Sequence, residues 1–377
     1  MAPIATATHF LQYLLTDMRA RAEQPLLCEK QGAIFHTVTL RETASRIADF
    51  ARALSAASIE QGDRVTLHAA ASPSLLIAEW AILAGKGVAV IVPRSFTPDE
   101  LIETLAESKS KIVIVERFAT AYHLAANASA IPDLKCIVCE EGNAHAALPI
   151  VSWGDFIDAG RMEPDRSTAL LRSITEKDTA LMFYYRDTDG QRHAIRYTHG
   201  LLLDHVGRIE AMFKDEAIQK GELVLNATSW EHAVGHIASC YAPVLKEALV
   251  QITHGIPDIS LFENTPQVTV GDAAFFDGIR QSILQLIRQS GQVESAMLNK
   301  ALALSKQNYE SQKKGLSPFA RLQWAMLQAT IVHKVKKLMG GQMRLFIGTD
   351  DEAHYETQLF FHTFGVNLIE LPQEVFK

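Results

Sequence analysis

Hydrophobic and polar positions in the first third of the chain alternate between helical and extended patterns. Apolar residues recur on one helical face from Leu40 to Leu54, and Thr39 with Glu42 forms a capping box in front of them. Short apolar runs that predict buried strands follow at 65–69, 88–92 and 112–115. Helix-start signals separate these runs, at Ser72-Pro73 and Thr97-Pro98. Strands separated by capped helices predict parallel pairing with right-handed crossovers, and so an α/β fold.

The same alternation continues through the rest of the chain. Further strands are predicted near Cys136 and at 180–184, 223–226, 248–252, 345–347 and 366–369. Between 275 and 339 the pattern is helical, and this block contains apolar residues at core-facing spacing: Phe319, Leu322, Met326 and Ala329. We expect one large α/β chain, residues 1–377, built from two subdomains that divide near residue 180, as 1–180 and 181–377.

Composition places the chain among ordinary globular proteins. Its 377 residues are 48% hydrophobic and 21% charged, and the formal net charge of −7 gives no reason to expect nucleic acid as a partner. Four cysteines are too few for a disulfide framework, which favours a reducing compartment. The N-terminus lacks a basic stretch followed by an apolar core, and no apolar run approaches the roughly 18 residues of a membrane helix. We therefore expect a cytoplasmic protein without a transmembrane segment.

The order and spacing of several segments carry a family resemblance. These segments are 61–65, 79–84, 92–101, 226–244 and 346–366. Together they resemble the large N-terminal domain of long-chain fatty acyl-CoA synthetases, adenylate-forming enzymes of the AMP-binding superfamily, over about residues 25–376. The resemblance implies parallel sheets flanked by helices, the use of ATP, Mg²⁺ and CoA, and an acyl pocket near Trp230, His232 and His236. It also implies a smaller lid domain that supplies a catalytic lysine, which we expect this chain to lack.

The family's phosphate loop is altered. The corresponding register, Tyr184 to Ala194, contains Arg186, Asp187, Thr188, Asp189, Gly190 and His193. Phosphate loops need small residues that let backbone N–H groups reach the phosphates, with hydroxyls and a lysine as further donors. Here Arg186 and Asp187 replace a serine and a glycine, Asp189 replaces a threonine, and His193 stands at the lysine. Carboxylates about 4–6 Å from a triphosphate repel it, so we expect no ATP binding. The alternative is that Asp187 and Asp189 hold Mg²⁺.

Two further nucleotide segments of the family also differ. The glycine-rich adenine turn is replaced by an acidic one that contains Thr349, Asp350 and Asp351. The segment that carries a threonine and a glutamate in the family reads Leu371-Pro372-Gln373-Glu374-Val375-Phe376, and Pro372 removes a backbone donor. These losses predict no catalytic residues, no cofactor and no enzymatic activity.

The remaining candidates concern metals and surfaces. Cys136 and Cys139 are three apart on a predicted strand and therefore face opposite sides, which disfavours zinc. His232 and His236 would share a helical face, but no third ligand accompanies them, so we expect no metal site. Apolar residues on the face that a lid would cover predict contact with a protein partner or a second copy: Leu371, Val375 and Phe376. Lysines in the helical block form either a solvated surface or a face for a partner or membrane: Lys306, Lys313, Lys314, Lys334, Lys336 and Lys337.

These observations lead to one interpretation with two alternatives. The favoured one is a pseudoenzyme that binds an acyl ligand, such as a fatty acid, or a protein partner. The first alternative is a divergent fatty-acid ligase that takes its lid domain from another chain. The second is a scaffold whose pocket is filled. For any of them, peripheral association with the inner membrane is an alternative to a purely cytoplasmic location.

Overall fold

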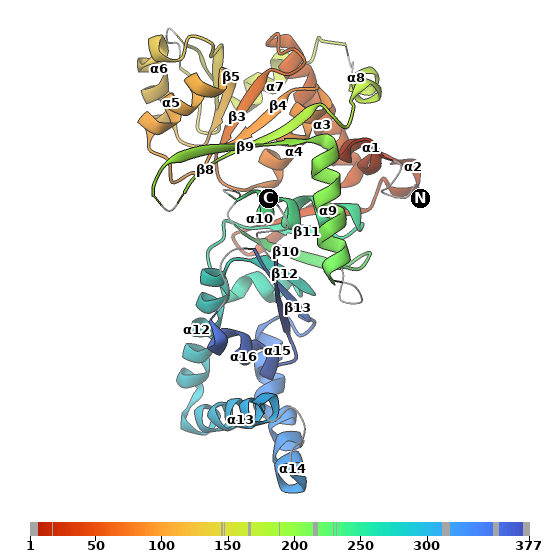
Figure 1. The fold of residues 1–377 in the computed structure, drawn as a ribbon, viewed down its shortest axis with the longest axis vertical. Helices are drawn as coiled ribbons and strands as arrows, with labels where there is room; N and C mark the ends of the chain where they lie inside the picture. The colour runs from red at the N-terminus through yellow and green to blue at the C-terminus, as the bar shows by residue number, and fades with distance from the viewer. Residues whose placement is uncertain are drawn as a thin grey trace.

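Two seven-stranded sheets, each with its own helices, form the body of the molecule (Figure 1). The computed structural model describes residues 7–16, 18–144, 146, 148–164, 167–187, 189–213, 218–228, 230, 232–310, 317–349 and 354–371. We call the two sheets the upper and the lower sheet after their positions in Figure 1. The α/β fold expected from the sequence is confirmed.

The upper sheet has the strand order β7-β6-β5-β3-β4-β8-β9. Its pairings are parallel except for the antiparallel pair β8–β9. The strands are β3 (Arg64–His68), β4 (Val88–Ile91), β5 (Ser110–Val115), β6 (Cys136–Cys139), β7 (Ile150–Ser152), β8 (Thr179–Arg186) and β9 (Arg192–Thr198). The helices between and beside them are α3 (Leu40–Ala56), α4 (Pro73–Ala84), α5 (Pro98–Ser108), α6 (Phe118–Ala126), α7 (Trp153–Ala159), α8 (Ser167–Ser173) and α9 (His199–Phe213).

The lower sheet has the strand order β14-β13-β12-β10-β11-β1-β2. Its strands are β1 (Pro25–Gln31), β2 (Ile34–Thr39), β10 (Leu223–Ala227), β11 (Leu249–Ile252), β12 (Val268–Gly271), β13 (Leu345–Gly348) and β14 (Asn367–Glu370). Its helices are α10 (Ala233–His236), α11 (Ala242–Leu245), α12 (Ala273–Ser290), α13 (Gln292–Glu310), α14 (Pro318–Leu327), α15 (His333–Leu338) and α16 (Tyr355–Thr363), with π-helical segments at Ile237–Tyr241 and Gln328–Val332. Two short helices precede β1, α1 (Phe10–Leu14) and α2 (Met18–Arg21).

The helix caps predicted from the sequence are formed in the structure. Thr39 and Glu42 form the capping box of α3, and Thr97 and Glu100 form that of α5. The Ser72 side chain caps α4 by accepting a hydrogen bond from the Leu75 amide at 3.1 Å. These caps satisfy amide donors that the first turn of a helix leaves without partners, which fixes where each helix begins.

Strand pairing does not follow a division of the chain near residue 180. Strands β1 and β2 come early in the sequence, yet β1 pairs with β11 in the lower sheet. Strand β8 crosses residue 180 and pairs with β4 in the upper sheet. One continuous core joins the two sheets, with Val65 and Ala180 on the upper side and Val224 and Val250 on the lower.

The helix that contains Phe319 exposes the side chains that were predicted to face the core. Phe319, Leu322 and Met326 are 68%, 62% and 65% exposed, and Ala329 is also exposed, so the prediction that they face a core was wrong. Figure 1 shows the reason: α14 extends past the end of α13, at the tip of the molecule far from the upper sheet. Farther along the same helical segment, Val335 packs in the core of the lower half.

Candidate nucleotide loop and ligand pocket

The segment that corresponds to the phosphate loop forms a tight β-hairpin between β8 and β9. Arg186 and Arg192 are paired across its base. The Asp187 amide donates to the Gln191 carbonyl at 2.9 Å, and the Gly190 amide donates back to the Asp187 carbonyl at 3.0 Å. Gly190 has φ of 77°, a conformation that glycine adopts without steric cost. The backbone therefore closes on itself at this turn.

The carboxylate of Asp187 lies at the centre of this turn. It accepts hydrogen bonds from the backbone amides of Asp189 at 3.0 Å and Gln191 at 2.8 Å. His193 Nε2 contacts the other carboxylate oxygen at 2.6 Å. The hydrogen bond with His193, supported by the two amides, lowers the pKa of Asp187. Two backbone amides of the turn thus bind the carboxylate of the same turn and not an external anion.

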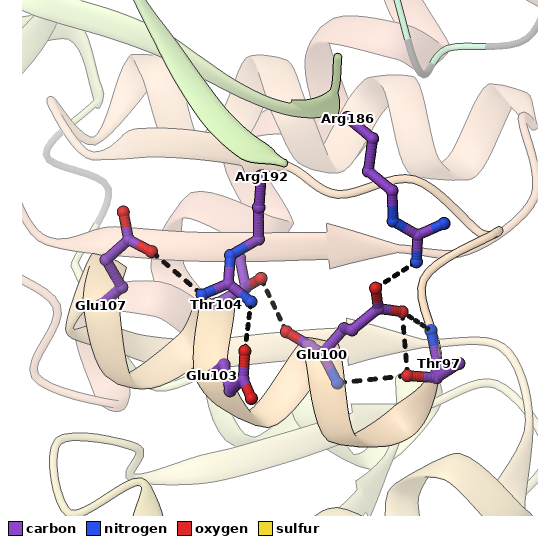
Figure 2. Close-up of polar contacts among 7 residues, drawn as sticks. All are labelled: Thr97, Glu100, Glu103, Thr104, Glu107, Arg186 and Arg192. Carbon is purple, nitrogen blue, oxygen red and sulfur yellow. Dashed lines mark hydrogen bonds and ion pairs between the residues drawn. The ribbon is translucent and has the colours of Figure 1, made fainter. Parts of the chain in front are cut away.

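Two arginines hold the hairpin against α5 (Figure 2). Arg186 pairs with Glu100 and lies over the Phe96 ring, 4.8 Å from its centroid. Arg192 pairs with Glu103 at 2.7 Å and with Glu107 at 3.4 Å.

Glu100 also takes part in the cap of α5. It accepts the Thr97 amide at 2.7 Å and the Thr97 hydroxyl at 2.9 Å, and the bond from that amide is the main cause that lowers the pKa of Glu100. The positive charges at the base of the hairpin are therefore balanced by carboxylates of a neighbouring helix. Asp189 lies exposed at the turn, and Thr188 lies outside the described residues.

The other two altered segments meet at the end of the lower sheet. Thr349 is buried, and its amide donates to the Gly271 carbonyl at 3.1 Å. Leu371 is 1% exposed, and its amide donates to the Gly348 carbonyl at 2.9 Å. Leu371 is thus part of the core, and its prediction as part of an exposed contact face was wrong, because it continues the register of β14 beside β13. Asp350, Asp351, Val375 and Phe376 lie outside the described residues.

The three residues expected at the acyl pocket occupy different environments. Trp230 is buried, with its ring centroid 4.9 Å from that of His236. His236 is completely buried, whereas His232 is exposed. His232 precedes α10 with extended backbone angles, φ −113° and ψ 127°, so the two histidines do not share a helical face as predicted. The helix begins one residue too late to bring them together.

A buried polar cluster lies next to Trp230, and it was not predicted from the sequence. Glu79 of α4 is completely buried and faces His236, whose Nε2 lies 2.9 Å from its carboxylate. The Tyr241 hydroxyl donates to the same carboxylate. Burial alone lowers the pKa of His236, but the negative charge of Glu79 outweighs it and raises that pKa to about 10. The signal available in the sequence was a lone carboxylate in an otherwise apolar helix, since every other residue of α4 from Leu75 to Ala84 is apolar.

A pocket of about 220 Å³ lies beside this cluster, between the two sheets. Most of its lining lies at or just beyond the carboxyl ends of strands in both sheets, and Leu75 comes from α4. The lining residues are Leu67, Ala69, Ala71, Leu75, Ile91, Val92, Arg94, Thr228, Trp230 and His254. Crevices outside the carboxyl ends of parallel strands are the usual ligand sites of open α/β sheets. The lining is mostly apolar, with Arg94 as its fixed cation and Thr228 and His254 as further polar groups. Arg94 pairs with Glu116 at 3.1 Å and is half exposed.

The described part of the chain contains neither a candidate metal-binding group nor a candidate membrane-spanning helix. It contains no group of three or more histidine, cysteine or acidic side chains that could hold a metal ion. Cys139 lies in the core on one face of the upper sheet and Cys136 packs on the other, as expected. Burial raises the pKa of Cys136 to about 11, which keeps the thiol protonated at neutral pH. Among the described helices, none is long and apolar enough to cross a membrane.

Residues 19–343 match the family of AMP-binding enzymes. The chain belongs to this family. The matched range covers both sheets apart from β13 and β14, so the match extends far beyond the altered loop.

Relatives of known function match at low identity. Acetyl-coenzyme A synthetase 1 of Pseudomonas aeruginosa is 24% identical over 246 residues, which are 62% of this chain and 36% of the relative. A chloroplastic long-chain-fatty-acid–[acyl-carrier-protein] ligase of Arabidopsis thaliana is 22% identical over 209 residues, 52% of this chain and 28% of the relative. This chain therefore matches about a third of the length of these relatives or less, 36% of the first and 28% of the second.

Solved structures share the fold. The adenylation domain of a carboxylate reductase from Mycobacterium chelonae superposes with a TM-score of 0.73 at 13% identity, over 97% of this chain and 57% of that chain. The inhibitor-bound N-terminal domain of FACL13 from Mycobacterium tuberculosis gives a TM-score of 0.69 at 13% identity, over 97% of this chain and 75% of that chain. The expectation of an acyl-CoA synthetase-like large domain is confirmed at the level of the fold.

Proposed function

We propose that this member of the AMP-binding family is a pseudoenzyme that binds a small acyl ligand without activating it. The observation that carries the proposal is the Asp187 carboxylate, which occupies the amides of the altered phosphate loop. A bound triphosphate would have to displace it and break its contacts with Asp189, Gln191 and His193. The fixed negative charge of Asp187 would also repel a phosphate at the same site.

The same geometry disfavours a magnesium site at the hairpin. Asp187 already accepts two amides and contacts His193, so a cation would replace hydrogen bonds that are already formed. Asp189 lies exposed at the same turn. Magnesium at this pair would therefore have to displace the contacts that Asp187 makes within the turn.

The pocket between the sheets favours a short acyl ligand. Its volume of about 220 Å³ lies below the roughly 300–1,000 Å³ of sites for drug-sized molecules. Apolar side chains such as Leu67 and Leu75 fit an alkyl chain, and Arg94 with His254 fits a carboxylate at the polar end. Trp230, held against His236, closes one side. Short carboxylic acids therefore suit this pocket better than long-chain fatty acids.

The experiment that tests the proposal is a thermal melting series on the whole chain. Ligand at 100 times its dissociation constant stabilises a protein by about 2.7 kcal/mol, which melting readily detects. We expect no shift with millimolar Mg-ATP and an upward shift with butanoate or hexanoate. Ala71→Phe fills the pocket and should abolish the acid shift, whereas Ala57→Phe, a partly buried alanine outside the lining, should preserve it.

Two results would contradict the proposal. An upward shift with Mg-ATP that Asp187→Ser increases would favour the alternative of a divergent ligase, with its lid on another chain. Equal shifts for hexanoate in the Ala71→Phe and Ala57→Phe variants would show that the pocket is not the acid site.

A further inference from the structure

Helix α14 carries an exposed apolar face. Phe319, Leu322 and Met326 follow one another at intervals of three and four residues, which places them on one side of the helix. Each is more than 60% exposed, at 68%, 62% and 65%. Large apolar side chains grouped on one helical face are usually covered by something, because leaving them in water forgoes the free energy of their burial.

The position of α14 makes this face accessible to a large flat partner. The helix projects at the tip of the molecule, away from the upper sheet and beyond α13 (Figure 1). Its far side holds it in place, since Leu327 is buried and Trp324 packs against the core of the lower half. The helical segment then continues through residues 328–332 into α15, where Val335 is completely buried. The apolar tip is thus anchored in the core of the lower half.

The segment around α14 is basic, and this charge indicates which kind of partner fits the apolar face. Residues 317–349 carry five lysines and arginines and no aspartate or glutamate, although the whole chain has a net charge of −7. The basic residues are Arg321, Lys334, Lys336, Lys337 and Arg344, of which Arg344 pairs with Glu222 at 2.7 Å and Lys334 lies 3.8 Å from Glu294 of α13. The three lysines are exposed on α15, the continuation of the same helical segment. An apolar face followed by basic side chains is the pattern of helices that lie in the surface of an anionic bilayer.

We propose that α14 docks the protein on an anionic lipid surface, with Phe319, Leu322 and Met326 inserted among the headgroups and with Lys336 and Lys337 of α15 facing the lipid phosphates. A second copy of this chain suits the face less well. Two copies meeting through it would bring their basic segments together, and like charges across an interface oppose association. Lipid phosphates instead complement the basic residues.

The test is co-sedimentation of the whole chain with vesicles. One set contains phosphatidylcholine alone, and the other contains equal parts of phosphatidylcholine and phosphatidylglycerol. We expect binding to the anionic vesicles, at least tenfold weaker binding to the neutral ones, and release at high salt. The triple variant Phe319→Gln, Leu322→Gln, Met326→Gln should lose at least tenfold in affinity for the anionic vesicles.

A matched control separates this face from general surface hydrophobicity. The triple variant Ile34→Gln, Tyr122→Gln, Ile256→Gln removes side chains that are 62%, 62% and 69% exposed elsewhere on the molecule, and should bind as wild type. Circular dichroism and melting confirm that both variants are folded. Wild-type protein that stays in the supernatant with anionic vesicles would overturn the proposal. So would vesicle binding by the α14 variant equal to wild type, or a wild-type dimer that this variant converts to monomer without any vesicle binding.

Discussion

Glu79 and His236 pair across 157 residues of sequence at the centre of the core. Both side chains are completely buried, and Tyr241 donates to the same carboxylate. Burial and the nearby Glu79 charge raise the pKa of Tyr241 well above its usual value, so its hydroxyl remains a donor. A buried ion pair of this kind contributes little net stability, but removing one partner leaves a charge without compensation. The cluster therefore fixes α4 against the π-helical segment Ile237–Tyr241 and holds His236 beside Trp230.

Removal of one partner should be costly. Glu79→Leu is expected to lower the free energy of unfolding by about 3–5 kcal/mol, because His236 and Tyr241 lose their acceptor. Adding His236→Leu should recover a large part of this loss, leaving about 1–3 kcal/mol for the Tyr241 hydroxyl. Urea unfolding measures both, with the exposed Glu60→Leu as a control expected to stay within about 0.5 kcal/mol of wild type. A near-neutral Glu79→Leu would show that the cluster does not hold the core together.

The β8–β9 hairpin, which was predicted to correspond to the family's phosphate loop, is held against α5 by ion pairs. Arg192 has 24% of its side chain exposed, and its partners Glu103 and Glu107 have 65% and 55% exposed. Ion pairs this exposed are individually weak, because solvent screens them and ordering long side chains costs entropy. Their importance lies in holding the hairpin down on α5, with the Asp187 turn at its tip.

Loss of these ion pairs should affect local opening more than global stability. The double variant Arg186→Ala, Arg192→Ala is expected to cost no more than about 2 kcal/mol in total, because each exposed pair contributes roughly 0–1 kcal/mol. Hydrogen exchange at the amides of β9 should nevertheless accelerate, since local opening no longer breaks contacts with α5. Arg161→Ala removes a comparable exposed pair with Asp158 and should leave exchange in the hairpin unchanged. Unchanged exchange in the double variant would mean that backbone pairing alone holds the hairpin.

Across the whole molecule, the pKa values of buried histidines are shifted in opposite directions. Burial, followed by the charge of His9, lowers the pKa of His199 to about 4, although Asp178 acts in the opposite sense and Lys86 in the same sense as His9. The pKa of His9, which lies 5.8 Å from His199 between ring centroids, is also lowered by burial. The pKa of His236 is raised to about 10, with Glu79 outweighing burial. The ordinary histidine value is about 6.5.

These shifts predict a maximum of stability near pH 6.5. A depressed pKa means that the folded state resists protonation, so the contribution of His199 is present above pH 6.5 and is lost as the pH falls towards 4. A raised pKa means that the folded state retains the proton, so the contribution of His236 is present below pH 6.5 and is lost as the pH rises towards 10. Melting temperatures between pH 4.5 and 9.5 should fall on both sides. His199→Gln should flatten only the acidic side, and the double variant Glu79→Leu, His236→Leu only the alkaline side. Unaltered slopes in these variants would assign the pH dependence to other groups.

Short-range information in the sequence determined most of the elements. The capping boxes of α3 and α5 act within four residues, and the strands from β3 to β5 are runs of apolar side chains. Such patterns depend on neighbours along the chain, so they are visible without a structure. The order of these elements also indicated the family. The altered residues of the phosphate loop were visible for the same reason, since each is a substitution within one short segment.

Only the tertiary structure decided features that depend on residues far apart in the sequence. The pairing of β1 with β11, the burial of Glu79 against His236 and the anchoring of Arg192 on α5 each join segments separated by 85 residues or more. Periodicity shows that the Phe319 helix has an apolar face, but not whether another element covers that face. Likewise, the carboxylates of Asp187 and Asp189 predicted repulsion of phosphate, whereas the fold showed that Asp187 itself accepts hydrogen bonds from the amides of the turn. Long-range packing decides which side chains meet, and local patterns do not contain that information.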